Sequence, residues 1–157
     1  TRLRNLLKIG EWKEADYETY LVMLQVLGRE EKDWIRNEEL LNFPCKDLRT
    51  INTLWVKYSN GKFGFSVQKE IYLSVGGKAD GKYNEETWIK LAEKVGWRMN
   101  DSWIIEGEAT YNTLATKGHL PFWGSKVGVR EKGSMRGVFW VGVMFSSLAS
   151  RLARCSI

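Results

Sequence analysis

Apolar residues recur at helical spacing along most of this 157-residue chain, in segments that end at glycine or proline. Leu3, Leu6 and Leu7 open the first segment, and Gly10 is a typical helix stop. The same spacing returns along the chain, whereas no pair of alternating runs is joined by the usual hairpin turn. The pattern predicts an all-α fold with helices over residues 3–9, 11–27, 38–42, 48–58, 67–75, 85–95 and 143–154.

Capping residues predict several of the helix ends. Asp47, Ser66 and Asn84 each precede an apolar run, and their side-chain oxygens can accept a bond from a free backbone N–H at a helix start. Gly96 is the stop signal after Val95. A chain of this length usually builds one hydrophobic core, so we expect a single domain of six to seven helices.

The stretch from Trp97 to about Arg136 shows no helical period. Six of the chain's 15 glycines lie between residues 118 and 142. A run of this length without regular structure is typical of a binding loop or a lid. Its aromatic residues argue against disorder, and we therefore expect one long, glycine-rich, aromatic loop. The aromatic residues are Trp97, Trp103, Tyr111, Phe122 and Trp123.

The net charge of +5 is concentrated in the last third of the chain. Residues 1–108 hold 17 basic and 18 acidic residues, whereas residues 109–157 hold seven basic residues and one acidic residue. Cations beside aromatic rings suit single-stranded nucleic acid, an anionic membrane surface, or a flat anionic cofactor such as a tetrapyrrole. Composition does not separate these ligands, although no zinc-finger or RNA-recognition motif is present.

Residue types that carry catalysis are sparse. His119 is the only histidine, and neither a nucleophile elbow nor a phosphate-binding loop occurs. Cys45 and Cys155 are too few for a disulfide scaffold or a multi-cysteine zinc site, and we expect Cys45 to be a buried structural thiol. The sequence therefore predicts a binding protein with no catalytic residue and no metal ligand.

Several blocks of sequence resemble one known family, the genomes-uncoupled (GUN) domain of oxygenic phototrophs. The central block ends in Lys-Phe-Gly-Phe-Ser-Val-Gln-Lys, and a later one reads Lys-Gly-His-Leu-Pro. Together the blocks cover nearly the whole chain. They are residues 6–18, 42–51, 54–69, 95–98 with Trp103, 117–121 and 150–155.

The resemblance implies an all-helical domain shaped like a cupped hand, whose apolar concave surface holds protoporphyrin IX or magnesium-protoporphyrin IX. It implies a non-catalytic regulator that stimulates magnesium chelatase through the large, porphyrin-binding subunit. A bilin-binding domain with a sensing or carrier role is the alternative. We expect residues 1–157 to form one domain excised from a longer chain. We further expect a monomer with peripheral membrane association and no nucleic-acid partner, in the cytoplasm of a cyanobacterium or in the chloroplast stroma.

The same resemblance assigns roles to individual residues. His119 is expected to fix the loop by hydrogen bonds rather than to bind a metal, and Lys117 to pair with a ligand carboxylate. The basic residues from Lys126 to Arg136 have no assigned role. The residues expected to contact the ligand are Val56, Phe63, Phe65, Trp97, Trp103, Tyr111, Lys117 and Phe122.

Overall fold

The computed structural model describes residues 1–104, 106–122 and 135–157. Helices dominate these ranges, which confirms the expected all-α fold. The α-helices are α1 (Arg2–Ile9), α2 (Trp12–Val26), α3 (Asn37–Leu41), α4 (Cys45–Tyr58), α5 (Phe65–Ser74), α6 (Glu85–Val95) and α7 (Met135–Arg154). The short elements are β1 (Arg98–Met99), β2 (Ser102–Trp103) and a single 3₁₀ turn, η1 (Glu106–Glu108).

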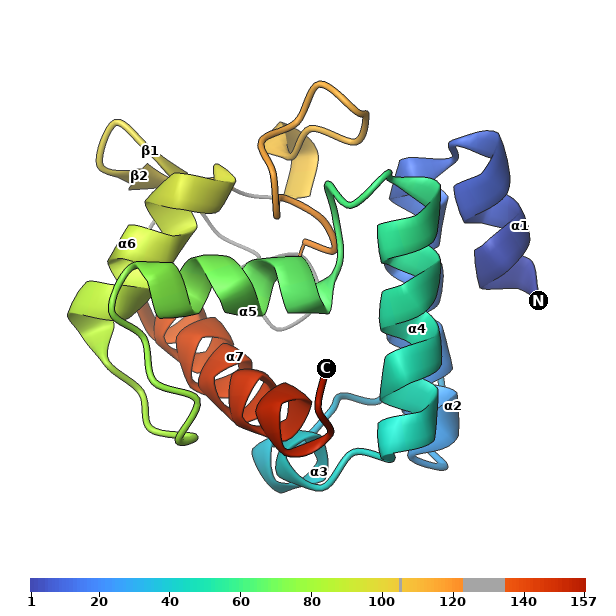
Figure 1. Ribbon diagram of the computed structural model, residues 1–157, viewed down its shortest axis with the longest axis horizontal. Coiled ribbons are helices and arrows are strands. Elements are labelled where there is room, and N and C mark those ends of the chain that lie inside the picture. The colour runs from blue at the N-terminus through green and yellow to red at the C-terminus, as the bar shows by residue number, and fades with distance from the viewer. Residues whose placement is uncertain (105, 123–134) are drawn as a thin grey trace.

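The helices form two groups that share one core (Figure 1). On one side α1 packs against α2 and α4. On the other side the long helix α7 packs against α3, α5 and α6, and it also contacts α4. The connection between α4 and α5 bridges the two groups, so its sequence sets how they meet.

Several helix ends lie where local signals predict them. The side chain of Asn84 accepts a bond from the Thr87 N–H at 2.9 Å and caps α6. Gly10 and Gly96 end α1 and α6 in the left-handed conformation, both with φ of 79°. Glycine adopts this conformation without steric cost, which explains why it stops a helix.

Other boundaries differ from the prediction. Helix α4 begins at Cys45 after Pro44, so Asp47 lies inside its first turn and is not the cap. Helix α5 begins at Phe65 with Gly64 as its cap, so Ser66 is not the cap either. Helix α7 begins at Met135, eight residues before the predicted start at Val143, because Gly137 and Gly142 do not end it.

Within the stretch predicted to lack regular structure, β1 and β2 form a hairpin that the pattern of alternating apolar and polar residues did not predict. Each strand has two residues, which is too short for a period of two to be visible. The turn residues Asn100 and Asp101 have φ of 49° and 60°, as the type I′ turn of a tight hairpin requires.

Cys45 and Cys155 are joined in a disulfide, so the prediction of a free structural thiol at Cys45 is wrong. The two residues are 110 positions apart in the sequence, and only the packing of α7 beside α4 brings them together.

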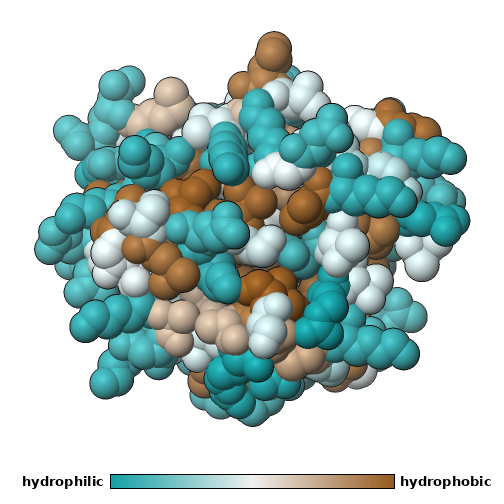
Figure 2. Space-filling view, in the orientation of Figure 1, coloured by the Kyte–Doolittle hydropathy of each residue, from teal (hydrophilic) through white to brown (hydrophobic). Residues whose placement is uncertain are grey.

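The face shown in Figure 2 carries apolar residues across its middle, over α5 and beside the C-terminal end, with hydrophilic residues around them. None of the helices in the described ranges combines the length and the apolar composition that a bilayer crossing requires.

Candidate functional site

Two stretches that carry the family-like motifs meet in space. The connector (residues 61–65) joins α4 to α5, and the GHLP segment (residues 117–122) follows the loop after η1 (Figure 1). We call the line along which they pair the seam.

Backbone hydrogen bonds close the seam. The Gly64 N–H donates to the Leu120 carbonyl at 3.1 Å, and the Gly118 N–H donates to the Lys62 carbonyl at 2.9 Å. Gly64 has φ of 131°, a conformation that side-chain-bearing residues rarely adopt. A Cβ at this position would also lie 2.9 Å from Val56 Cγ2. Glycine is therefore needed for the connector to turn this close to α4.

The side chain of Gln68 in α5 holds the GHLP segment by two hydrogen bonds. Its Nε2 donates to the carbonyls of Gly118 and Pro121, both at 2.9 Å. The side chain is fully buried, and its Oε1 has no hydrogen-bond partner. If the segment moved away from Gln68, the carbonyls of Gly118 and Pro121 would lose this donor inside the core, which is costly. The two bonds therefore fix the position of the segment.

Two further elements hold the same segment. The Trp97 Nε1–H donates to the His119 carbonyl at 2.8 Å. The Phe122 N–H donates to Asp16 Oδ1 of the buried Asp16 side chain at 2.7 Å, which ties the segment to α2. Residues of three family-like blocks, 6–18, 54–69 and 95–98, are thus joined by hydrogen bonds to the GHLP segment.

His119 fixes the loop with both ring nitrogens. Nε2 accepts from the Thr110 N–H at 3.0 Å, so Nδ1 carries the proton and donates to the Val95 carbonyl at 2.7 Å. Burial lowers the pKa of the imidazole, although the bond to Val95 and the charge of Asp16 oppose this shift. Neither nitrogen is left for a metal, and the described residues contain no cluster of three or more metal-binding side chains. The expected loop-fixing role is confirmed.

Four of the eight predicted ligand contacts are buried in the core. They are Phe63, Phe65, Trp97 and Phe122, each 2% exposed or less. Phe63 packs edge-on against Trp12 at 5.6 Å between ring centroids, and Trp97 packs edge-on against Phe122 at 6.2 Å. These rings form the floor under the seam, and a ligand could touch them only after side chains move.

The other four predicted contacts reach the surface. Val56, Trp103 and Tyr111 are half-buried, and Lys117 is exposed. Trp103 stacks on Trp88 with 5.6 Å between centroids and 20° between planes, so one face of its indole is covered. No salt bridge or side-chain hydrogen bond joins Lys117 to the described residues. Lys126 and Trp123 lie outside the described residues.

Sequence reasoning missed Asp16 and Gln68, which hold the seam. Both lie inside the family-like blocks, and Gln68 is three positions after Phe65 and four before Tyr72. That spacing places it on the buried face of α5. The apolar spacing of Val67, Ile71 and Val75 predicts a different face, of which only Val67 is buried. A polar residue that lies at helical spacing from two buried aromatic residues was the sequence feature that could have identified Gln68.

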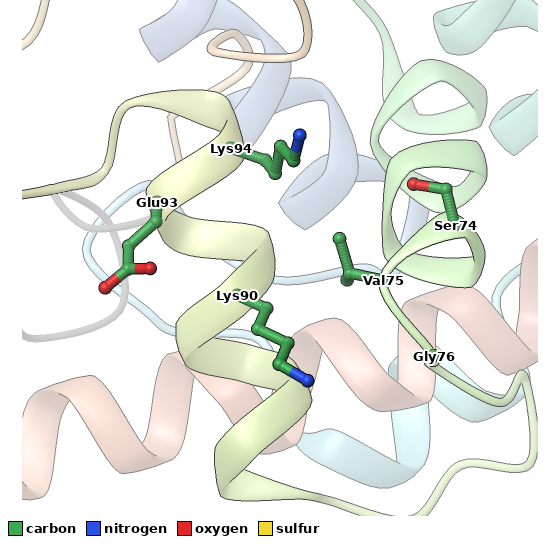
Figure 3. Close-up of a pocket in the computed structure, with 6 residues that line it drawn as sticks. All are labelled: Ser74, Val75, Gly76, Lys90, Glu93 and Lys94. Atoms are coloured by element: carbon green, nitrogen blue, oxygen red, sulfur yellow. The ribbon is translucent and has the colours of Figure 1, made fainter.

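A separate surface depression of about 540 Å³ lies between the end of α5 and α6 (Figure 3). It contains none of the predicted contacts. Its cations are Lys90, which pairs with Glu86 at 2.8 Å, and Lys94. The side chain of Glu93 pairs with Arg98 at 2.5 Å. The lining residues are Ser74, Val75, Gly76, Lys90, Glu93 and Lys94.

The sequence model of the GUN4-like family matches residues 1–136. The chain belongs to the GUN4-like family. The match contains the connector, the GHLP segment and the residues that tie them together.

Relatives of this GUN4-like chain come from cyanobacteria and chloroplasts. A Ycf53-like protein of Synechocystis is 36% identical over 109 residues, which are 69% of this chain and 43% of that protein. The tetrapyrrole-binding protein of Arabidopsis thaliana chloroplasts is 30% identical over 122 residues, which are 76% of this chain and 46% of that protein. The chain therefore spans about half the length of the curated relatives it matches.

Two solved GUN4 structures have the same fold. Ligand-free GUN4 of Arabidopsis thaliana has a TM-score of 0.67 and 25% identity, covering 94% of this chain and 91% of that one. GUN4 of Chlamydomonas reinhardtii has a TM-score of 0.65 and 29% identity, covering 94% of this chain and 86% of that one.

Proposed function

We propose that the chain binds a tetrapyrrole of the porphyrin class, protoporphyrin IX or its magnesium form, on the surface beside the seam. In this proposal residues 1–157 act as one non-catalytic binding domain. With the porphyrin bound, the chain regulates magnesium chelatase through the large porphyrin-binding subunit of that enzyme. The observation that carries the proposal is the convergence of four family-like blocks (6–18, 54–69, 95–98 and 117–121) on the seam, in a chain whose Arabidopsis relative is named a tetrapyrrole-binding protein.

We assign Val56, Trp103, Tyr111 and Lys117 to this surface, because their side chains fit the chemistry of a porphyrin and reach the solvent. A flat apolar macrocycle needs aromatic surface, which Trp103 and Tyr111 supply, with Val56 beside the connector. The carboxylates of the macrocycle need a cation at the edge, and Lys117 is exposed immediately before Gly118 of the seam. The buried rings of the floor keep this surface rigid, which reduces the ordering cost of binding.

The apolar contact supplies most of the affinity. Burying about 300 Å² of macrocycle is worth on the order of 5–10 kcal/mol before the costs of immobilisation. An exposed charge pair adds about 0.2–1 kcal/mol, so Lys117 orients the ligand more than it holds it. We therefore expect Trp103 to matter more for affinity than Lys117.

While the disulfide is closed, a bilin would have to bind without a covalent bond. Covalent attachment uses a cysteine thiol, and both cysteines of the chain are joined to each other. Non-covalent bilin binding is the alternative outcome of the titration below. We further propose a monomer at the membrane surface, in the cyanobacterial cytoplasm or the chloroplast stroma.

Absorption titrations with protoporphyrin IX, magnesium-protoporphyrin IX, haemin and a bilin test the proposal. We expect a saturable shift of the Soret band with the porphyrins. Trp103→Ala should weaken binding about ten-fold and Lys117→Ala about two- to five-fold, consistent with the energies above. Trp34→Ala and Lys82→Ala are the matched controls, because both residues are exposed and lie far from the seam in the sequence.

Absence of any Soret shift would refute porphyrin binding, and a spectral change with the bilin alone would favour the alternative. Equal effects of Trp103→Ala and Trp34→Ala would refute the location. Stimulation of magnesium chelatase needs a separate assay, in which the purified chain is added to the enzyme with saturating porphyrin. An unchanged rate in that assay would remove the regulatory part of the proposal and leave the binding part intact.

A further inference from the structure

The disulfide joins two elements that the rest of the fold holds only by packing and hydrogen bonds. Cys45 is the first residue of α4, and Cys155 directly follows the last residue of α7. Their Cα atoms are 5.4 Å apart, which lies in the ordinary range for a disulfide. The bond therefore closes a loop that contains most of the chain.

We propose that the Cys45–Cys155 bond is a thiol–disulfide exchange site, which a dithiol reductant opens in the folded protein. Opening it removes the covalent link between the C-terminal end of α7 and α4.

Access favours attack at Cys45. Its side chain is half-buried, whereas Cys155 is 4% exposed. A thiolate of the reductant attacks the Cys45 sulfur, and the Cys155 sulfur leaves with the electron pair and takes up a proton. The second thiol of the reductant then attacks the mixed disulfide, and Cys45 leaves as a thiolate that is protonated in turn. The protein gains two electrons and two protons, and the reductant becomes a disulfide.

The surroundings favour the thiolate of Cys45, which is the leaving group of the second step. Cys45 lies at the N-terminal end of α4, where the positive end of the helix dipole stabilises an anion. Lys46 follows it, and the guanidinium of Arg49 donates from Nη2 to the Cys155 carbonyl at 2.5 Å. Asp47 is the acidic residue in the same turn.

The remaining anchors of the C-terminal end explain why the reduced protein stays folded. Arg151 Nε donates to the Phe43 carbonyl at 2.7 Å, and Arg154 Nη1 donates to the Leu41 carbonyl at 3.3 Å. Lys69 Nζ donates to the carbonyl of Ile157. Reduction leaves these bonds in place but removes the constraint on the unfolded chain. We therefore expect a less stable and locally looser protein, not an unfolded one.

The experiment uses the purified chain in buffers of oxidised and reduced dithiothreitol. In oxidised buffer we expect fewer than about 0.1 reactive thiols per native molecule, and about two after reduction, by titration with a thiol reagent. Reduction should lower Tm by about 10 °C and increase amide exchange at residues 150–157. The double variant Cys45→Ser/Cys155→Ser is the matched control, and its Tm should equal that of the reduced chain in both buffers.

Three results would overturn the proposal: two reactive thiols in oxidised buffer, a Tm that reduction does not change, or reduction that is no faster than global unfolding. The direction of attack has its own test. A thioredoxin whose second active-site cysteine is replaced by serine should be trapped on Cys45, as located by peptide mass spectrometry, and trapping on Cys155 would contradict the assigned direction.

Discussion

Gln68→Met tests whether the buried amide holds the seam. Methionine has nearly the same length and removes both hydrogen bonds while leaving little cavity. The carbonyls of Gly118 and Pro121, each bonded to Gln68 Nε2 at 2.9 Å, then lose that partner inside the core.

The expected destabilisation follows from three contributions. Each buried carbonyl that loses its donor costs about 1–3 kcal/mol, so the two together cost about 2–6 kcal/mol. Gln68 Oε1 is itself buried without a partner, and its removal returns about 1–2 kcal/mol. The net loss in the free energy of unfolding is therefore about 0–5 kcal/mol, with a central value of about 2–3 kcal/mol.

Urea unfolding measures this loss, and amide exchange locates it. We expect faster exchange of the Gly118 and Phe122 amides, which donate to Lys62 and Asp16. Gln25→Met is the control, since Gln25 is exposed on α2 and its replacement should change stability by less than about 0.5 kcal/mol. A Gln68→Met variant as stable as the control, with both amides still protected, would refute the role of Gln68.

Three other changes test the fold around the seam. Because burial lowers the pKa of His119, the unfolded chain binds a proton below pH 6.5 that the folded chain does not. Stability should therefore fall by up to about 1.4 kcal/mol per pH unit as the pH drops below 6.5, until it reaches the lowered pKa of the folded chain, and this contribution should stay level above pH 6.5. In His119→Gln this slope should vanish in urea unfolding, and an unchanged slope would contradict the assignment. Phe65→Ala should cost about 3–5 kcal/mol, since the ring is 1% exposed, whereas Leu73→Ala at a position 43% exposed should cost less than about 1 kcal/mol. Asn84→Ala should cost about 1 kcal/mol through loss of the α6 cap, measured by thermal unfolding, and a neutral result would mean that the cap contributes nothing.

Helix ends that depend on near neighbours could be predicted from the sequence. Asn84 bonds a residue three positions away, and Gly96 needs only its own backbone conformation. The start of α5 could not be predicted in this way. Its cap, Gly64, is held by the Leu120 carbonyl from a distant part of the chain. The disulfide escaped prediction for the same reason, because packing of α7 against α4 decides it.

The residues around the candidate site were predictable as a group but not by position. Motif resemblance identified the connector and the GHLP segment, and the structure joins them. It could not separate rings that form the floor, such as Phe63, from rings that reach the surface, such as Trp103. That difference depends on which neighbours cover each ring, and residues far apart in the chain supply those neighbours.

We propose that the surface beside the seam receives the porphyrin. Two-dimensional NMR of the ¹⁵N-labelled chain with magnesium-protoporphyrin IX tests it most directly, because the ring current of the macrocycle shifts nearby protons. We predict that the largest shifts occur at the Trp103 indole N–H and at the amides of Tyr111 and Lys117. Shifts confined to Ser74 and Lys94 in the depression between α5 and α6, or no shifts at all, would contradict the claim.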